Sequence, residues 1–342
     1  MRRIYADTAT ATIATAKVIT LTFAAPVPSI SNTVIFTVSG CFQCDGPDTA
    51  VQRHTTGADG KMKSETILES RKGPLAGYTL GLAGADATGA MLWAVACESD
   101  YCGGLGFHPL DTWRVFWSFD AGNTWSVAYE MGVEYLSVSS AAGQTLAITS
   151  VTPGGPPSLQ RYFLVDEKGP REVFPPPSAG AFPTPIVLTG GRLIWAESSN
   201  DKGPGRNAVF AADGAELITL PEGEELTYDS PAQRPDGSLM VGVYSPANYG
   251  FDIYAGQSGP KSNMFARDPS ARMRLPGAYR FAGAGQRYVL SNATGASFGL
   301  SDFATSYPVL IDLDAKAATP ITSGVFTEQR GRNRFIAMTQ LP

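Results

Sequence analysis

Short apolar runs separated by polar turns make up most of the chain, and apolar residues at helical spacing are nearly absent. The runs are rich in β-branched and aromatic residues and are bounded by Gly, Pro, Asp or Ser, which is typical of strands. Seven similar runs start 46 to 58 residues apart, at Val34, Leu92, Leu146, Leu193, Leu239, Arg287 and Phe335. A turn centred on Asp or Gly follows each of the first six, at Asp59-Gly60, Asp120 to Gly122, Asp166 to Gly169, Asp213-Gly214, Gln257 to Gly259 and Asp312 to Asp314.

Two interleaved series with a common period of about 48 residues indicate one supersecondary unit repeated about seven times. The unit reads strand, turn, strand, loop, strand, Asp/Gly turn, strand, which is the pattern of a four-stranded propeller blade. We therefore predict an all-β fold, a seven-bladed β-propeller of antiparallel blades forming a single domain over residues 1–342. Six blades of about 57 residues is the alternative.

The last run, at Phe335, leaves room for only two strands before the chain ends. The alternating segment Arg3 to Ile13 resembles an edge hairpin and is expected to complete that blade. Pairing of the N- and C-terminal strands would then close the ring and protect the strand edges that an open array exposes.

Composition narrows the class of protein. The 342 residues include 37 Gly and 25 Pro, and 43% are hydrophobic, which excludes a disordered chain, a coiled coil and a collagen-like repeat. A net charge of −5 gives no broad basic surface, so we expect no nucleic-acid partner. No run reaches the 18 or more apolar residues of a membrane helix, so membrane insertion is not expected.

One turn carries a fuller motif, Ser118-Phe-Asp120-Ala-Gly122-Asn-Thr124-Trp125. Asp120 can accept backbone N–H groups across the turn, and Gly122 tolerates a positive φ. Thr124 and Ser118 can bridge the strands, while Trp125 can bury a large ring between blades. The motif resembles the Asp-box of the sialidase-like, or BNR-repeat, propellers. That resemblance implies an architectural role on the hairpin between the third and fourth strands, away from the ligand face.

Sialidases of this fold use three arginines, a Tyr/Glu nucleophile pair, an acid Asp and an early R-I-P motif, so the resemblance can be tested. The nearest string here, Arg3-Ile4-Tyr5, lacks the Pro. Arg53, Arg114, Arg161 and Arg206 are expected near the starts of third strands, on the ligand face but far from the central channel. Only Arg280 is expected near the channel on the ligand face, so a three-arginine clamp is not predicted.

In propellers the ligand face is built from the loops between second and third strands and from those linking successive blades. These loops carry carboxylates and tyrosines, which suit hydrogen bonding and stacking with sugars or a protein surface. The candidate ligand-binding residues are Asp45, Asp48, Asp100, Tyr101, His108, Asp111, Tyr228, Asp229, Tyr249, Tyr279 and Arg280.

The four cysteines fall in two close pairs, Cys41 with Cys44 and Cys97 with Cys102. Two local disulfides would pin these loops in an oxidising compartment, and they favour a secreted or cell-envelope location, although no signal peptide is recognisable. Disulfides that bridge the two blades, a Cys₄ zinc site and free thiols remain alternatives. Calcium-binding spacing of the EF-hand type is absent, and we expect no metal or cofactor.

The sequence therefore predicts a non-catalytic binding module that recognises a glycan or a protein surface through its loop-rich face. A glycoside hydrolase using two rim carboxylates is the first alternative, because such enzymes need two acids about 5 to 9.5 Å apart. A structural subunit of a larger assembly, marked by a large apolar patch, is the second.

Overall fold

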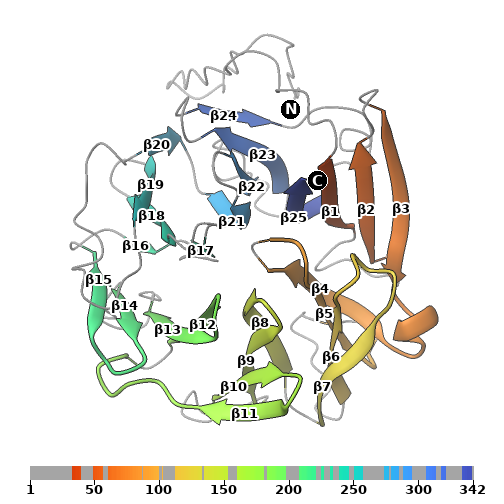
Figure 1. Cartoon of the computed structure of the whole chain (residues 1–342), viewed down its shortest axis with the longest axis horizontal. Helices are drawn as coiled ribbons and strands as arrows, with labels where there is room; N and C mark the ends of the chain where they lie inside the picture. Colours follow the sequence, from red (N-terminus) through yellow and green to blue (C-terminus); the bar gives the residue numbers. More distant parts are fainter. Residues whose placement is uncertain are drawn as a thin grey trace.

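Strands make up nearly all of the described part of this computed structural model, with a single 3-10 helix, η1 (Gly73–Leu75) (Figure 1). The structure describes residues 33–39, 49–56, 61–86, 88–99, 102, 112–132, 135–152, 160–180, 183–197, 208–220, 225–226, 232–233, 239–245, 250–256, 273–276, 279–284, 288–294, 306–312, 317–320 and 333–340. Within these residues no helix is long and apolar enough to cross a membrane.

The strands form antiparallel sheets, named A to F, each with at least four strands. Sheet A, in spatial order, contains β25 (Asn333–Gln340), β1 (Thr33–Ser39), β2 (Ala50–Thr56) and β3 (Met62–Glu69). Sheet B contains β4 (Thr79–Ala85), β5 (Leu92–Cys97), β6 (Thr112–Ser118) and β7 (Ser126–Gly132). Sheet C contains β8 (Tyr135–Ala142), β9 (Thr145–Val151), β10 (Arg161–Asp166) and β11 (Gly169–Val173).

The second half of the chain repeats this order. Sheet D contains β12 (Thr184–Leu188), β13 (Arg192–Glu197), β14 (Ala208–Ala211) and β15 (Glu216–Thr219). Sheet E contains β16 (Glu225–Leu226), β17 (Ala232–Gln233), β18 (Leu239–Ser245), β19 (Gly250–Gly256) and β20 (Met273–Pro276), with β16 and β17 both paired to β18. Sheet F contains β21 (Tyr279–Ala284), β22 (Tyr288–Thr294), β23 (Ser306–Asp312) and β24 (Ala317–Pro320).

Figure 1 shows the sheets arranged around a common centre, as in a β-propeller. The predicted all-β fold of four-stranded antiparallel units is therefore confirmed. The first six apolar runs form the second strand of each sheet, and the six Asp- or Gly-centred turns fall between third and fourth strands. The apolar runs thus mark the second strand of the repeated unit, and the turns mark the connection between its third and fourth strands.

The described strands form six sheets, because the runs at Val34 and Phe335 belong to the same sheet. A count of the apolar runs along the sequence therefore includes sheet A twice. The segment Arg3 to Ile13, expected to pair with the C-terminal strand, lies outside the described residues. In its place β1 pairs with β25, so that the last described strand lies beside the first.

Irregularities in pairing recur at equivalent places and support the repeat. One extra residue interrupts the pairing of the first strand with the second in sheets A, B, C and F; these residues are Ile336, Gly81, Ser139 and Ala282. A similar extra residue occurs in the fourth strand of sheets A, B and D, at Ile67, Ala128 and Leu217. Such bulges increase the local twist of a strand, so the sheets that carry them gain twist at equivalent steps.

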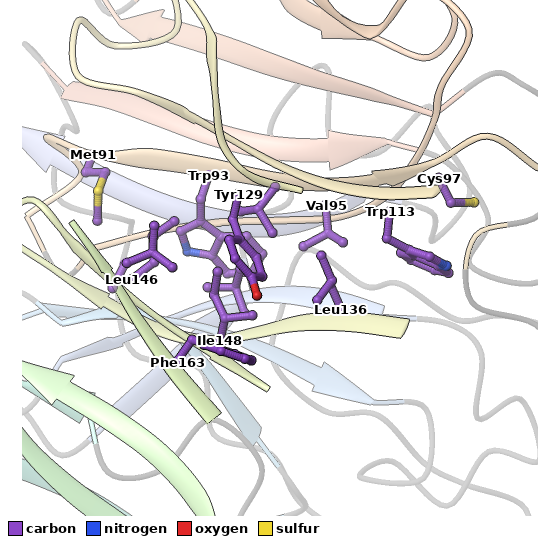
Figure 2. Close-up of a cluster of buried hydrophobic side chains, with 14 of the residues drawn as sticks. Met91, Trp93, Val95, Cys97, Trp113, Tyr129, Leu136, Leu146, Ile148 and Phe163 are labelled. Carbon is purple, nitrogen blue, oxygen red and sulfur yellow. The ribbon is translucent and has the colours of Figure 1, made fainter. Parts of the chain in front are cut away.

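Apolar side chains fill the space between neighbouring sheets. Between sheets B and C, Trp93, Val95 and Trp113 pack with Leu136 and Ile148 in one buried cluster (Figure 2). Further clusters join sheet A to B, C to D and D to E. The core is thus a series of interfaces around the centre, and the ends of the strands, with their loops, remain available to build a site.

Candidate functional site

The strand order brings two kinds of connection to one end of the sheets. In an antiparallel four-stranded sheet, the loop between the second and third strands lies at the same end as the link to the next sheet. We call this end the loop face. On it, the connection from β3 to β4 turns through η1, and the Arg71 N–H donates to the Tyr78 carbonyl at 2.8 Å. The Glu98 N–H, just after β5, donates to the Thr112 carbonyl at 3.3 Å.

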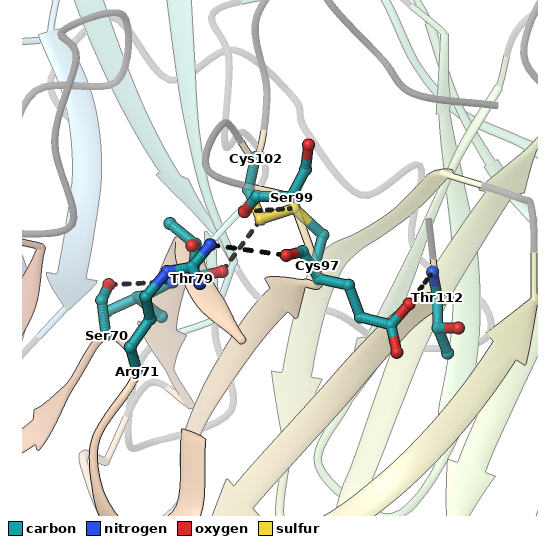
Figure 3. Close-up of a disulfide and its surroundings, with 9 residues drawn as sticks. Ser70, Arg71, Thr79, Cys97, Ser99, Cys102 and Thr112 are labelled. Carbon is teal, nitrogen blue, oxygen red and sulfur yellow. Dashed lines mark hydrogen bonds between the residues drawn. A yellow bond between two sulfur atoms is a disulfide. The ribbon is translucent and has the colours of Figure 1, made fainter. Parts of the chain in front are cut away.

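A disulfide joins Cys97, the last residue of β5, to Cys102, with Cα atoms 5.7 Å apart (Figure 3). It confirms one of the two predicted pairs, whereas Cys41 and Cys44 lie outside the described residues. Both cysteines are buried. Cys102 lies directly over β4, where a Cβ added to Gly81 would come within 2.6 Å of the Cys102 Cβ. The disulfide therefore fixes the start of the β5–β6 connection against the first strand of its own sheet.

A polar group adjoins this disulfide, and we call it the Tyr78 cluster: Tyr78, Glu98, Arg114 and Glu130. The Tyr78 hydroxyl donates to Glu98 Oε1 at 3.4 Å, and the Thr112 N–H donates to Glu98 Oε2 at 3.3 Å. The Arg114 guanidinium stacks on the Tyr78 ring, 4.5 Å from its centroid, and its Nε pairs with Glu130 Oε2 at 2.6 Å. Three segments distant in the sequence thus meet around one tyrosine.

Electrostatics keep Tyr78 protonated. Burial raises the pKa of its hydroxyl, the nearby Arg114 lowers it and the Glu98 carboxylate raises it again, for a net increase. Since only 6% of Tyr78 is exposed, its phenol is a hydrogen-bond donor held in place and a poor source of phenolate. The cluster suits recognition through Arg114 and Glu130, which are both partly exposed, better than nucleophilic attack.

Three of the four arginines predicted near the starts of third strands lie on those strands and form ion pairs there, whereas Arg206 lies outside the described residues. Arg53 pairs with Glu65 at 3.0 Å, Arg114 with Glu130, and Arg161 with Glu172 at 2.9 Å. Each pair joins the third strand of sheet A, B or C to the fourth. This arrangement agrees with the prediction that these residues form no three-arginine clamp.

The predicted ligand-binding residues lie mostly beyond the part of the chain that the structure describes. Those outside it are Asp45, Asp48, Asp100, Tyr101, His108, Asp111, Tyr228, Asp229 and Tyr249. Tyr279 and Arg280 are the first two residues of β21, the first strand of sheet F. Their backbones pair with Ala293 and Asn292 of β22. The roles of all these residues in binding stay predictions.

The turn between β6 and β7 forms the predicted hydrogen bonds. Asp120 accepts from the Thr124 N–H at 2.8 Å and its hydroxyl at 2.6 Å, and from the Ser118 hydroxyl at 2.9 Å. These bonds lower the pKa of Asp120 to about 2, the Thr124 hydroxyl contributing most. Gly122 has φ +87°, and its amide donates to Ser118 Oγ at 2.9 Å. The turn lies between the third and fourth strands of sheet B, as expected.

The same turn also binds the neighbouring sheet. Arg53 Nη1 of β2 donates to the Ala121 carbonyl and to Asn123 Oδ1, both at 3.0 Å. Trp125 packs partly buried against the apolar cluster between sheets A and B, which confirms its predicted place between two sheets. The motif therefore fastens sheet B to sheet A at the outer side of the molecule.

Sequence reasoning missed the Tyr78 cluster and the buried Glu197 at the end of β13. Glu98 follows an apolar strand directly, and Glu197 ends the run Leu193-Ile-Trp-Ala-Glu197. An acid at the end of a buried second strand is the signal that could have identified both. In the described residues no group of three His, Cys, Asp or Glu side chains is placed to hold a metal ion.

No protein-family model and no curated protein matches the sequence. Solved structures with a similar course of the chain include an oligogalacturonate lyase in complex with manganese, 13% identical, with a TM-score of 0.47 over 84% of this chain and 78% of that one. An acylaminoacyl peptidase from Pyrococcus horikoshii is 10% identical, with a TM-score of 0.46 over 86% of this chain and 51% of its own. A puromycin-hydrolyzing peptidase from Mycobacterium tuberculosis is 14% identical, with a TM-score of 0.44 over 90% and 46%.

This chain spans about half the length of the two peptidases. At these identities and TM-scores, the likenesses carry no argument about what the chain binds or converts.

Proposed function

We propose that the protein is a non-catalytic binding module, a six-bladed β-propeller of the Asp-box type that recognises a glycan or a protein surface with its loop face. Contacts between neighbouring sheets support the ring. β17 of sheet E contacts β21 of sheet F, and β25 of sheet A contacts both β21 and β4. The hydrogen-bonded turn at Asp120 supports the Asp-box assignment.

The observation that carries the binding role is the disulfide between Cys97 and Cys102. The β5–β6 connection is the longest between a second and a third strand. The disulfide holds Cys102, near the start of this connection, against β4. A loop held in one conformation loses less entropy when it binds a partner, so preorganisation increases affinity. A covalent anchor on the loop face therefore suits a recognition loop.

The side chains beside the anchor favour recognition over hydrolysis. The Tyr78 phenol is held protonated, Glu98 accepts two hydrogen bonds, and Arg114 is paired. These groups are satisfied by one another, whereas a hydrolytic site needs an acid and a base kept available for the substrate.

The test is a glycan array and a protein array probed with the purified protein, run beside turnover assays on chromogenic glycosides. We expect saturable binding without turnover. In the Cys97→Ser/Cys102→Ser variant binding should weaken about tenfold, because the ordering cost of the loop is then met on binding. Lys168→Gln, an exposed residue of the β10–β11 turn at the opposite end of sheet C, is the matched surface control and should bind normally.

Turnover of a glycoside by the wild-type protein contradicts the proposal and supports the alternative, a glycoside hydrolase. The absence of binding on both the glycan array and the protein array contradicts the proposal as well.

A further inference from the structure

Phe174 is a highly exposed aromatic residue on the loop face. It directly follows β11, at the start of the link from sheet C to sheet D. Its exposed fraction is 75%, against 44% for Phe119 and 46% for Val127, the other exposed large apolar residues of the described chain. Single exposed apolar residues are normal on protein surfaces, so a role for Phe174 depends on the segment that carries it.

That segment has the backbone of a polyproline II helix. Three prolines, Pro175 to Pro177, follow Phe174. Proline fixes its own φ at about −65° and keeps the preceding residue extended, and residues 174–176 belong to no strand, helix or turn. A polyproline II helix has three residues per turn, so Phe174 and Pro177 lie on the same edge. Both are exposed, whereas Pro176 is buried. We call the exposed edge, Phe174 with Pro177, the Phe174 ridge.

Sheet D holds this segment in place from behind. The Ser178 hydroxyl donates to the Gly214 carbonyl at 3.1 Å, in the turn between β14 and β15. A Cβ added to Gly214 would lie 3.4 Å from the Pro176 Cβ, so the buried proline packs closely on the same turn. The Ala179 N–H donates to the Pro176 carbonyl at 2.9 Å. The ridge is therefore held in one conformation while the Phe174 ring faces solvent.

The chemistry of the ridge suits a protein groove better than a glycan. Residues 175–177 are prolines and have no N–H group, and the Ser178 hydroxyl is already used by Gly214. A sugar needs polar groups placed to bind its hydroxyls, and this segment offers none of its donors for that purpose. Polyproline segments are read instead by grooves lined with aromatic side chains, and a preformed segment loses little entropy on binding.

We propose that the Phe174 ridge docks into an aromatic-lined groove of a partner protein, with the Phe174 ring buried in that groove and the Pro177 ring beside it. Aromatic residues are enriched in the cores of protein interfaces, which fits Phe174 as the anchor. This inference rests on the proposed binding role of the loop face, and it names the partner as a protein that reads polyproline segments.

The experiment measures binding of the intact protein to isolated SH3, WW and EVH1 domains, which carry such grooves, by calorimetry. At least one domain should bind saturably. Phe174→Ser should weaken this binding at least about tenfold, because the anchor ring is lost, and Pro177→Ala should weaken it as well. Phe119→Ser is the matched control and should bind like the wild type, because Phe119 is an exposed phenylalanine in the β6–β7 turn, at the opposite end of the sheets.

Thermal unfolding and sedimentation separate docking from other roles of the ring. Because Phe174 is exposed, Phe174→Ser should unfold at the temperature of the wild type and keep its mass in solution. The proposal is overturned if no domain binds, if wild type and Phe174→Ser bind equally, or if the variant unfolds at a lower temperature. A change in mass would assign the ridge to contact between two copies of the chain and overturn it too.

The same variant distinguishes this inference from the proposed function. Loss of glycan-array binding in Phe174→Ser would assign the ring to a sugar and overturn the docking proposal while leaving the binding role of the loop face in place. Silence on the glycan and protein arrays bears on the proposed function, whereas the isolated domains test the Phe174 ridge directly.

Discussion

At the scale of single residues, His54 shows how completely the sheet can satisfy a buried polar side chain. It lies on β2 of sheet A and has no exposed surface. Thr37 Oγ1 lies 2.8 Å from its Nε2, and Ser64 Oγ lies 2.8 Å from its Nδ1. Both ring nitrogens therefore have a hydroxyl partner from an adjacent strand, and a hydroxyl can serve the neutral imidazole as donor or acceptor.

Burial lowers the pKa of His54 to about 4, so we predict a loss of stability in mild acid. Because the pKa of His54 is lower in the folded protein than in the unfolded chain, its contribution is complete above pH 6.5 and is lost as the pH falls toward 4. The loss should be about 2 kcal/mol by pH 5 and about 3 kcal/mol below pH 4. Urea unfolding at several pH values measures it.

The control for this prediction is His54→Gln, which keeps hydrogen-bonding capacity but does not titrate. Subtracting its pH profile removes the contributions of the carboxylates. Parallel profiles for the two proteins between pH 7 and 5 would show that His54 is not responsible.

At the scale of the element, the β6–β7 turn is held by one carboxylate. We predict that Asp120→Ala lowers the thermal unfolding temperature, because the Thr124 N–H and hydroxyl and the Ser118 hydroxyl lose their acceptor. Asp213→Ala, in the equivalent turn of sheet D, is the matched control, since its described side-chain bond is a single one to the Ala215 N–H. Calorimetry should show the smaller decrease for Asp213→Ala, and equal decreases would contradict the assigned role.

Because the pKa of Asp120 is lowered to about 2, its contribution is present above the ordinary pKa of an aspartate and declines as the pH falls toward 2. The difference between wild type and Asp120→Ala should therefore shrink in strong acid.

The turn and the second strands could be predicted from the sequence because their signals are local. Eight adjacent residues define the Asp120 turn, and a strand such as Leu92–Cys97 is apolar throughout. The number of sheets could not be read in this way. Val34 and Phe335 have the same apolar pattern, and only pairing between the two ends of the chain places them in one sheet.

The Tyr78 cluster could not be predicted from the sequence either, because its contacts also join segments that are distant in the sequence. Tyr78, Glu98 and Arg114 come from an inter-sheet link, the end of a second strand and the start of a third. None of them has a distinctive neighbour in the sequence, and their contacts exist only once β4, β5 and β6 pair. The disulfide was predictable because its two cysteines are separated by five positions.

At the scale of the whole molecule, sheet A joins the first described strand to the last. Its first strand comes from residues 333–340 and its other three from residues 33–69. β25 also contacts β21, β22 and β23 of sheet F. If the ring is closed in this way, all six sheets share one closed arrangement, and its weakest point is the junction of β25 with β1, because no turn connects them.

We predict that a disulfide across this junction stabilises the whole protein. Val34 pairs with Thr339 in the register of β1 and β25, so Val34→Cys/Thr339→Cys should form a cross-link. Since it would constrain nearly the entire unfolded chain, the gain should be about 2–4 kcal/mol. Peptide mass spectrometry identifies the cross-link apart from the native cysteines, and unfolding with and without reductant measures its effect. Val34→Cys/Phe335→Cys, in which the second cysteine faces Thr37 instead, should form no cross-link. A cross-link in that pair, or none in the first, would show that the ends of the chain meet in another register and that the ring does not close through β25.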